Sequence, residues 1–412
     1  MGFSSEYISR RKFLIQSAVG TLFWLSFPSI RQVKAATSTS NPIFWIWSIP
    51  DDPFVDPSRP NRHKGIDALL HWMGMKGLKF YRSNLLTTTS GPWGMIETDD
   101  VVLIKVNAQW KYRGCTNSDL IRGLIQRIRE HPGGFRGEVV IIENGQGRGS
   151  LNCDTKSGYP DGSVQANAND TTHSFVHLVD HILKDSRVSY YLLDSIRNKF
   201  IGADDHVTDG YRTFENVSYP CFTTKGGHRV ELREGIWQGN GYTQNLKLIN
   251  VPVLKHHDEG GSEITESLKH FYGILSMVDG HKDWRHYSGL GGTCGKMVVS
   301  IRTPILNIVD AIWASHLSLK GYPSETTFRT NQIMASQDPV ALDYCAAKYI
   351  LYPIDKNPRH HPQFSGVNRW LTDARTIING RGGIYNPYAG ILVHKVTKTE
   401  SEMLVFKAKP AV

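Results

Sequence analysis

The chain has 412 residues, of which 40% are hydrophobic and 21% charged, a composition typical of globular proteins rather than disordered or fibrous ones. Five cysteines are too few for a scaffold built on disulfides, and no apolar run reaches the roughly 20 residues that span a bilayer. The formal net charge is +9, but the first 35 residues carry five Lys/Arg and one Glu, so the remainder keeps +5. This modest excess, without a basic tract or nucleic-acid motif, argues against DNA or RNA as a partner and suits an anionic small ligand.

The N-terminus resembles an export signal. Residues 9–15 (SRRKFLI) are similar to the twin-arginine translocation signal of bacteria, and the apolar stretch at 18–27 is too short for a stable membrane span. Val33-Lys34-Ala35 has the small residues of a cleavage site. We therefore predict a signal peptide over 1–35, the twin-arginine translocation machinery as a partner, and a periplasmic or extracellular location with no membrane span after cleavage. The alternative is a basic, frayed N-terminus.

Strand and helix patterns alternate through the next part of the chain. The run at 101–107 is nearly continuous in β-branched residues, as expected for a strand covered on both faces. A helix over 118–130 has one apolar face, and a second buried-type strand follows at 138–144, so a βαβ unit with parallel strands is predicted. The other elements predicted here are a strand at 42–48, a helix at 64–75, extended chain at 78–81, a helix at 172–184 and a strand at 189–194.

The second half continues the alternation after a short antiparallel part. Residues 222–234 predict a hairpin that turns at Gly226-Gly227. Strands at 248–256 and 305–310, a helix at 263–276 and a helix opened by Asp338-Pro339 are also predicted. The fold class is therefore α/β, with a mostly parallel sheet, helices on both faces and a small antiparallel excursion near 205–245. Because no repeat or clean linker is visible, residues 36–412 are predicted to form a single lobed domain.

Polar side chains gather where the predicted strands end. Ligands of open parallel sheets bind outside the carboxyl ends of the strands. Lys105 and Asn107 share one face of their strand, and a buried ammonium at Lys105 requires a carboxylate or an anionic ligand beside it. The alternatives are a lysine that escapes at a sheet edge and a structural ion pair. The remaining polar residues at strand ends are Glu143, Asn144, Asp194, Lys255, His256 and Asp310, of which Asp194 is best explained as a capping or turn residue.

Histidines and a lysine follow the strand at 248–256. His256 and His257 are adjacent on an extended chain, so they point to opposite faces and only one of them is expected to face the site. The helix at 263–276 places Lys269 one turn before Gly273. A metal site built from His281, Asp283 and His286 is possible in principle, but no spacing demands one, so neither a metal nor a cofactor is assigned.

Several other polar features have simpler explanations. Residues 145–170 form a long Gly/Ser/Asn/Asp-rich loop of the kind that often serves as a lid or binding loop, with Arg148 interpreted as solvated. Asp338 is explained as a helix cap and Asp343 as a solvent-facing helix carboxylate. No C-x-x-C occurs, so no iron–sulfur or zinc box is visible. An oxidising compartment would permit disulfides among the five cysteines, but their connectivity stays open.

Five ordered motifs together resemble the family catalogued as domain of unknown function 362, most strongly over 98–355. They are VLIKVN at 102–107, VPVLKH at 251–256, SLKHFYG at 267–273, IVDAI at 308–312 and ASQDPVALD at 335–343. The resemblance implies candidate residues without implying their roles: Lys105, Asn107, Lys255, His256, Lys269, Asp310, Asp338 and Asp343. Some members carry ferredoxin-like cysteine clusters, and this chain lacks one, which puts redox chemistry by that route in doubt.

The predicted function is that of an exported enzyme acting on an anionic small molecule. Lys105 is predicted to belong to the catalytic group and, with Lys255 and Lys269, to hold negative charge. His256 is predicted to transfer protons, with Asp310, or Glu143 as second choice, orienting it or binding a cation. Asn107, Lys255, Lys269 and Glu143 form the predicted substrate-binding set. The alternatives are a non-catalytic periplasmic binding protein for a carboxylate or phosphate, and a scaffold that needs no pocket.

Overall fold

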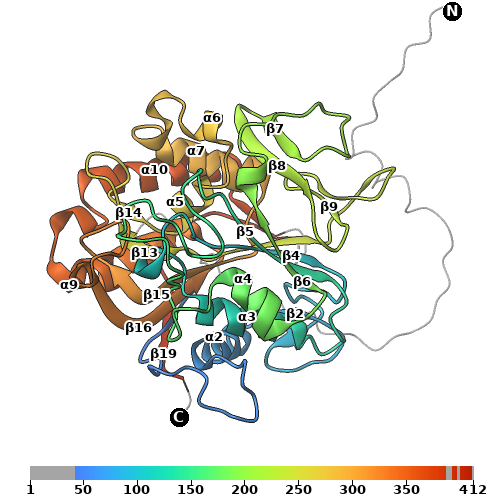
Figure 1. The fold of residues 1–412 in the computed structure, drawn as a ribbon, viewed down its shortest axis with the longest axis horizontal. Helices are drawn as coiled ribbons and strands as arrows, with labels where there is room; N and C mark the ends of the chain where they lie inside the picture. The colour runs from blue at the N-terminus through green and yellow to red at the C-terminus, as the bar shows by residue number, and fades with distance from the viewer. Residues whose placement is uncertain (1–41, 387–391, 397–399, 411–412) are drawn as a thin grey trace, which may run out of the picture. The chain divides into compact units, whose positions relative to one another are not determined.

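The computed structural model describes residues 42–386, 392–396 and 400–410, and Figure 1 shows their fold. These described residues group into one compact unit. The predicted signal peptide over 1–35 lies outside the described residues. Within the described part of the chain, no helix is both long and apolar enough to cross a membrane.

The described residues form a central sheet of ten strands in which most neighbouring pairs are parallel. This confirms the predicted α/β class with a mostly parallel sheet. The main path of the sheet runs in the order β19 (Val405–Ala408), β1 (Ile43–Ile46), β16 (Thr327–Ser336), β15 (Leu306–Ser315), β12 (Leu246–Asn250), β4 (Val101–Lys105), β5 (Glu138–Glu143) and β6 (Val188–Leu192). Two further strands, β13 (Val253–His256) and β14 (Ile264–Thr265), extend it beside β15.

The predicted βαβ unit is confirmed by β4, α3 (Ser118–Arg129) and β5. The two strands pair in parallel, from Val101 opposite Glu138 to Lys105 opposite Ile142. Asn117 caps the helix, because its side-chain oxygen accepts a hydrogen bond of 2.9 Å from the backbone N–H of Leu120. The carboxyl ends of β4 and β5 therefore lie side by side, with their polar residues at the same edge of the sheet.

Helices cover both faces of the sheet (Figure 1). Successive side chains of β4 point to opposite faces of the sheet. Val102 and Ile104 pack into the core that includes α2 and α3, whereas Val101 and Leu103 pack into the core on the other side. The first face is covered by α2 (Lys64–Met75), α3, α4 (Phe175–His177) and the wide-turn helix η2 (Leu178–Leu183). The second is covered by α5 (Ser267–Tyr272), α7 (Leu290–Lys296), α8 (Pro339–Ala346) and α10 (Ser365–Gly380).

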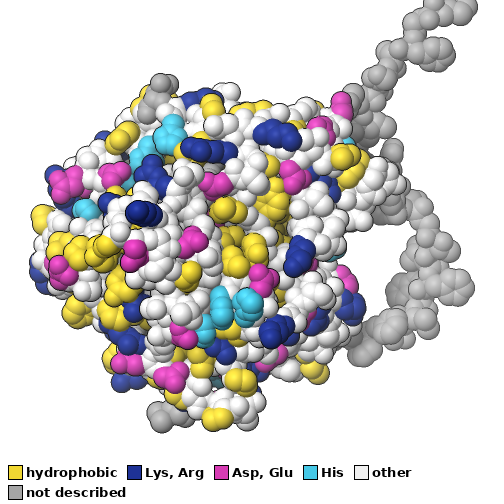
Figure 2. All heavy atoms as spheres, in the orientation of Figure 1, with side chains coloured by type: hydrophobic (Ala, Val, Ile, Leu, Met, Phe, Trp, Pro, Cys, Tyr) yellow, Lys and Arg dark blue, Asp and Glu magenta, His cyan; other side chains and the backbone are white. Residues whose placement is uncertain are grey.

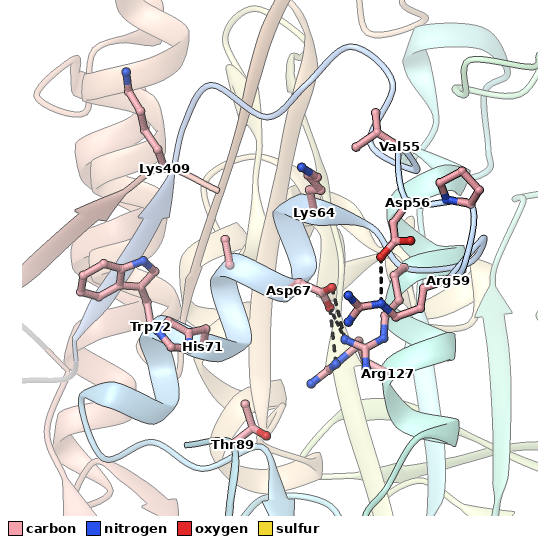
Figure 3. Close-up of a pocket in the computed structure, with 13 residues that line it drawn as sticks. Val55, Asp56, Arg59, Lys64, Asp67, His71, Trp72, Thr89, Arg127 and Lys409 are labelled. Carbon is pink, nitrogen blue, oxygen red and sulfur yellow. Dashed lines mark hydrogen bonds and ion pairs between the residues drawn. The ribbon is translucent and has the colours of Figure 1, made fainter. Parts of the chain in front are cut away.

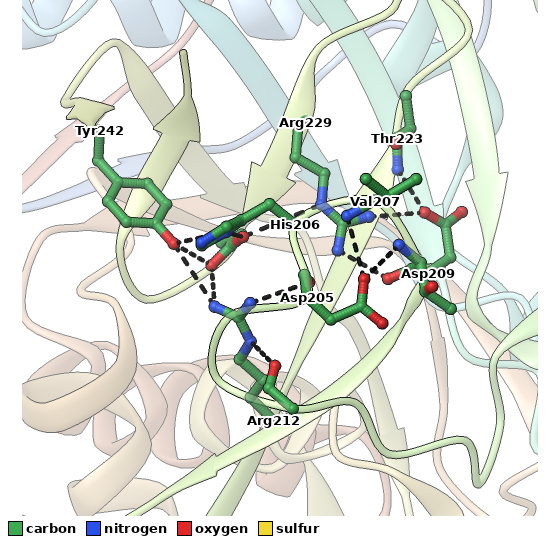
Figure 4. Close-up of polar contacts among 11 residues, drawn as sticks. Asp205, His206, Val207, Asp209, Arg212, Thr223, Arg229 and Tyr242 are labelled. Carbon is green, nitrogen blue, oxygen red and sulfur yellow. Dashed lines mark hydrogen bonds and ion pairs between the residues drawn. The ribbon is translucent and has the colours of Figure 1, made fainter. Parts of the chain in front are cut away.

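The predicted antiparallel excursion is a separate five-stranded sheet in the order β11 (Tyr242–Thr243), β10 (Gly235–Trp237), β9 (Arg229–Glu231), β8 (Val217–Thr223) and β7 (Gly210–Phe214). The predicted hairpin joins β8 to β9. Figure 4 shows how this sheet holds the loop before β7: the fully buried carboxylate of Glu231 binds Arg212, Tyr242 and the imidazole of His206. Arg229 pairs with Asp209 at 2.8 Å. Through His206 and Asp209, these contacts fasten the loop before β7 to β9 of the sheet.

Two predicted boundaries were wrong around residues 248–276. The single strand predicted at 248–256 is two strands, β12 and β13, separated at Val251-Pro252. Pro252 has no N–H to donate to the sheet, although its carbonyl accepts a hydrogen bond of 2.8 Å from the backbone N–H of Asp310. The helix predicted at 263–276 is shorter, because residues 264–265 form β14 and the helix proper, α5, covers only 267–272.

Other elements extend or add to the prediction. Asp338 caps α8 as predicted, with its carboxylate accepting from Val340 and Ala341, and η7 (Ala347–Leu351) continues that helix. β15 is longer than the predicted 305–310, and β16 and α10 were not predicted. Only the last four residues of β16 are buried, so its sequence TFRTNQIMAS lacks a continuous apolar signal.

The remaining elements are β2 (Tyr81–Arg82), β3 (Ser90–Gly91), η1 (Tyr112–Gly114), η3 (Leu193–Ser195), α6 (Met277–Gly280), η4 (Asp283–His286), η5 (Met297–Ile301), η6 (Ser324–Thr326), α9 (Tyr352–Asp355), η8 (Pro358–His360), β17 (Ile384–Asn386), β18 (Leu392–His394) and η9 (Glu400–Glu402).

Candidate functional site

A pocket of about 520 Å³ opens where several strands of the central sheet end, and we call it the strand-end pocket. Its walls include residues from the segments that follow β4, β5 and β13, together with one side of α5. The lining is polar and unbalanced in charge. Among its described lining residues, three side chains are Lys or Arg (Arg148, Lys269 and Lys320) and only one, Asp258, is a carboxylate. Three histidines, His257, His281 and His286, also line it.

Lys269 is a buried ammonium group in the pocket wall. Its Nζ lies 2.6 Å from Nε2 of His286 and above the ring of Tyr272, at 5.2 Å from the ring centre. Burial lowers the pKa of Lys269 to about 8. Burial and the nearby Lys269 charge lower the pKa of His286 to about 3. The lysine therefore carries the proton near neutral pH and donates to His286 Nε2, which leaves the ring proton of that histidine on Nδ1.

His257 also faces the pocket, and its protonation follows from its contacts. Burial, followed by the charge of Lys269, holds its pKa well below the usual range, so the ring is neutral. The backbone N–H of Asp258 donates to its Nδ1 at 2.7 Å. The ring proton must then be on Nε2, where it can act as a hydrogen-bond donor. The pocket thus combines a buried ammonium with a neutral N–H donor, an arrangement that suits an anionic oxygen.

Lys105 and Glu143 lie beneath the pocket as a buried ion pair. The Lys105 ammonium donates to the Glu143 carboxylate and to the carbonyl of Val106, the latter at 2.8 Å. Burial lowers the pKa of Lys105 and raises that of Glu143, and their mutual attraction opposes both shifts. The carboxylate also accepts from the backbone N–H of Ala108 at 3.2 Å. We expected a carboxylate or an anionic ligand beside a buried Lys105, and Glu143 is that carboxylate. A structural ion pair of this kind is one of the alternatives that the sequence left open.

A second lysine is buried without a carboxylate partner among its hydrogen bonds. Lys255 Nζ donates to Oδ1 of Asn107 at 3.2 Å and to the carbonyl of Gly114 at 2.7 Å. Burial lowers the pKa of Lys255 to about 7. Lys105, Lys255 and Asn107 are therefore close to one another but lie under the pocket wall, not on it. Of the residues predicted to bind substrate, only Lys269 lines the pocket.

His270 links the buried pair to the centre of the sheet, and sequence reasoning did not single it out. The side-chain nitrogen of Asn250 donates to Asn307 at 3.0 Å and to the carbonyl of Ser267 at 2.8 Å, so its oxygen faces His270 as an acceptor. Nδ1 of His270 therefore carries the proton, and Nε2 accepts from Lys105 at 3.1 Å. The sequence shows that His270 belongs to the SLKHFYG motif. It does not show that the His270 side chain points into the core, because a helix this short has no clear apolar face.

His256 points away from the strand-end pocket. Its Nδ1 lies 3.0 Å from Nε2 of His360, whose other nitrogen lies 3.3 Å from Asp355. The same aspartate contacts His316 at 3.0 Å. The sequence predicted that only one of the two adjacent histidines would face the site, and in the structure His257 takes that place. The predicted proton-transfer role of His256 has no geometric support from the pocket.

Asp310 fastens the βαβ unit rather than lining the pocket. Its fully buried carboxylate accepts from the backbone N–H of Asn117 at 2.7 Å and from that of Ile312 at 3.1 Å. Burial raises the pKa of Asp310 to about 7. Asp194, interpreted from sequence as a turn residue, accepts from the backbone N–H groups of Gly145 and Gly147 at the start of the long loop.

The interpretation of Asp343 as solvent-facing was wrong. Its carboxylate is fully buried and accepts from the backbone N–H groups of Ser267 at 2.8 Å and Leu268 at 3.0 Å, and from the Ser267 hydroxyl. Asp343 thereby holds the first turn of α5, the helix that carries Lys269. The error arose because α8 is buried on nearly all sides, so its polar residue does not mark a solvent face.

Other polar groups lie outside the strand-end pocket. Among the described residues, no group of three or more His, Cys, Asp or Glu side chains is arranged to hold a metal ion. On the face seen in Figure 2, histidines gather near α4, where the rings of His173, His177 and His181 follow one another at 5.3 and 4.9 Å. Lys and Arg are scattered among Asp and Glu on that face rather than gathered in a single patch (Figure 2).

A larger cavity, of about 830 Å³, lies along α2 (Figure 3). It contains several cations, but its arginines contact carboxylates that belong to the same cavity or its border. Arg59 contacts Asp56 at 2.8 Å, and Asp67 contacts Arg62 at 3.2 Å and Arg127 at 3.5 Å. Because these charges offset one another, the α2 cavity is a weaker candidate for an anion than the strand-end pocket.

Comparison with known proteins supports the family resemblance. No curated protein and no solved structure matches the chain. Residues 239–348 match the model of the family described as Domain of unknown function (DUF362). The matched segment contains the motifs at 251–273, 308–312 and 335–343, and the motif at 102–107 lies outside it. The segment supplies β13, α5 and Lys269, and the match supports the assignment of this part of the chain to the domain of unknown function 362 family.

Proposed function

We propose that this protein binds an anionic small molecule in the strand-end pocket and acts on it as an enzyme. The observation that carries the proposal is the composition of the pocket lining, in which three Lys/Arg and three His side chains accompany a single carboxylate. Lys269 would supply the positive charge, and Nε2–H of His257 would donate to an oxygen of the ligand. Arg148 and Lys320, on the rim, would raise the local concentration of anions.

Proton transfer would be the task of Lys269. Its pKa of about 8 lies close enough to neutrality for the group to exist in both forms. His286 accepts the hydrogen bond of the ammonium and so orients it toward the pocket. The Lys105–Glu143 pair and His270 would position the strand ends beneath the ligand. This assignment moves the proton-transfer role predicted for His256 to a side chain that lines the pocket.

One observation favours the alternative of a non-catalytic binding protein. The Lys269 ammonium already has an acceptor in His286, and a static ammonium of this kind is sufficient for binding without turnover. The two candidates share the same ligand class and differ only in what happens after binding.

A panel of small anions tests both candidates. Sulfate, inorganic phosphate, small dicarboxylates and sugar phosphates would be titrated by calorimetry, and each mixture would then be analysed by mass spectrometry for conversion. We expect at least one anion to bind, and Lys269→Met to weaken the affinity for that anion by at least about tenfold, close to 1.4 kcal/mol.

Lys225→Met is the matched control, because Lys225 is exposed in the hairpin turn. If no anion binds, or if Lys269→Met binds as well as the wild type, the proposal fails. A bound anion that is always recovered unchanged favours the binding protein.

We further propose that residues 1–35 direct the protein to the bacterial twin-arginine route, which places it in the periplasm or outside the cell. The support is the Arg10-Arg11 pair, the short apolar stretch and the cleavage-site pattern Val33-Lys34-Ala35, with cleavage after Ala35. In a bacterial host, replacing both arginines by lysine is expected to retain the full-length protein in the cytoplasm. Equal amounts of both forms in the periplasmic fraction would contradict the proposal.

A further inference from the structure

Two of the five cysteines lie close together in segments next to the strand-end pocket. The sulfur atoms of Cys115 and Cys153 lie 4.0 Å apart, and both side chains are buried. All five cysteines lie in the described part of the chain, and within it only these two have another cysteine sulfur as a contact partner. Cys294 instead contacts the carbonyl of Leu268, and Cys345 contacts the sulfur of Met403.

The pair joins two segments that are far apart in the sequence and both close to the pocket. Cys115 directly follows η1, and the carbonyl just before it, that of Gly114, receives the hydrogen bond of the buried Lys255. Cys153 lies in the long loop over 145–170. That loop contributes three residues to the pocket lining: Gln146, Arg148 and Ser157.

Hydrogen bonds join the long loop to the segment that carries Cys115. Lys111 Nζ donates to the carbonyls of Asp161 at 3.0 Å and Ser163 at 2.8 Å. The side-chain nitrogen of Asn167 donates to the carbonyl of Cys115 at 2.9 Å, and the carbonyl of Cys153 accepts from the backbone N–H of Gln165, also at 2.9 Å. The two sulfur atoms therefore face each other across a contact that both backbones maintain.

We infer that Cys115 and Cys153 form a disulfide that fastens the 145–170 loop over the rim of the strand-end pocket. A disulfide requires a sulfur–sulfur distance of about 2.05 Å, so the two atoms must approach by roughly 2 Å. Side-chain rotation accompanied by a small shift of the loop provides a movement of this size. The inference concerns the covalent state of the loop and stands whether or not the pocket binds an anion.

The oxidant is an external disulfide, either a small one such as glutathione disulfide or that of a thiol–disulfide exchange protein. The thiolate of one cysteine attacks a sulfur of the external disulfide and releases one thiol, which leaves a mixed disulfide. The second cysteine, as its thiolate, then attacks the protein sulfur of the mixed disulfide and releases the other thiol. In total, the two cysteines lose two protons and two electrons, and the external disulfide gains them. Because both thiols are buried, the first step requires the loop to open, and the finished bond then holds it closed.

The pairing is tested on the folded, full-length protein. One sample is incubated with glutathione disulfide and one with a reductant, and both are then acidified, unfolded, alkylated and digested for mass spectrometry. We expect a peptide that links Cys115 to Cys153 in the oxidised sample only, with Cys221, Cys294 and Cys345 alkylated in both. Equal alkylation of Cys115 and Cys153 in the two samples would overturn the inference, as would a link from either residue to another cysteine.

Fastening of the loop is tested by limited trypsin digestion of the same two samples. Arg148 and Lys156 are exposed cleavage sites within the loop. We expect cleavage at these sites to be several-fold slower after oxidation, and equal rates would overturn the claim that the bond holds the loop. Cys153→Ser should abolish both effects, whereas the control Cys345→Ser should retain both. If Cys153→Ser fails to fold, the oxidised and reduced wild-type samples decide the question without any variant.

Discussion

Lys105 and Glu143 face each other from adjacent parallel strands, and their side chains are only 1% and 3% exposed. Two opposite charges at the ends of β4 and β5 are thus held away from water directly beneath the polar pocket. Such a pair gains little over an apolar core, because removing both charges from water is costly. Its effect is to fix the geometry of the strand ends, since each charge requires the other in place.

The first prediction concerns this pair. Lys105→Met alone and Glu143→Gln alone are each expected to lower the free energy of unfolding by about 3–5 kcal/mol, because each leaves or disturbs a buried charge. The double variant should cost clearly less than the sum of the two, as measured by urea denaturation in a double-mutant cycle. Arg136→Ala, which breaks the exposed Arg136–Asp99 contact, serves as a control and should have little effect. Additive costs at Lys105 and Glu143 would contradict the coupling.

The second prediction concerns the pH dependence of anion binding. Lys269 is protonated below its pKa of about 8, so binding should be strongest below that pH. Above it, the affinity for sulfate, whose charge is constant in this range, should fall by about tenfold per pH unit. Lys269→Arg should move this fall to higher pH, because the guanidinium keeps its proton. Calorimetry between pH 6 and 9 measures the sulfate affinity of both proteins. An affinity of the wild type that does not change with pH would exclude Lys269 as the titrating group.

The third prediction concerns Glu266, which precedes α5. Neither of its carboxyl oxygens has a hydrogen-bond partner in the described structure, and burial, with the nearby Asp343, raises its pKa well above the usual range. Below pH ~4.3 the carboxyl is protonated in both folded and unfolded chains and contributes no pH dependence to stability. Above that pH the unfolded chain releases the proton and the folded one retains it, so stability should fall by up to about 1.4 kcal/mol per pH unit until the folded pKa is passed.

Glu266→Gln removes this titration and isolates its effect. The difference in unfolding free energy between the variant and the wild type should grow in favour of the variant between pH 5 and 8. Other buried carboxyls, such as Asp310, titrate in both proteins and cancel in the difference. A difference that does not change with pH would show that the Glu266 carboxyl titrates alike in the folded and unfolded chains.

The fourth prediction follows from the corrected position of Asp343. Asp343→Ala removes the acceptor for two backbone N–H groups at the start of α5 and should lower the free energy of unfolding by about 1–3 kcal/mol. Because α5 carries Lys269, anion affinity should fall as well. Asp180→Ala, at an exposed helical position, is the matched control. If Asp343→Ala proves as neutral as the control in chemical denaturation, its carboxylate does not hold the helix.

Much of the fold was predictable because its signals are local. The β-branched run at β4 and the amphipathic pattern of α3 specify buried strand and one-sided helix through their own periods of two and 3.6. Caps such as Asn117 and Asp338 are likewise properties of a few neighbouring residues. The break at Pro252 was less evident, since the strands on either side of it have the same apolar character and only their partners differ.

The sequence by itself determined the α/β class, the βαβ unit and the need of a buried Lys105 for a negative partner, because periodicity and the cost of burying a charge act wherever the residues sit. Only the tertiary structure decided that Glu143 is that partner, that His257 rather than His256 faces the pocket, and that Cys115 lies beside Cys153. These relationships join residues that are not neighbours in the sequence, with 38 positions between Lys105 and Glu143 and likewise between Cys115 and Cys153. The direction of each side chain there depends on which strands become neighbours, which no local pattern encodes.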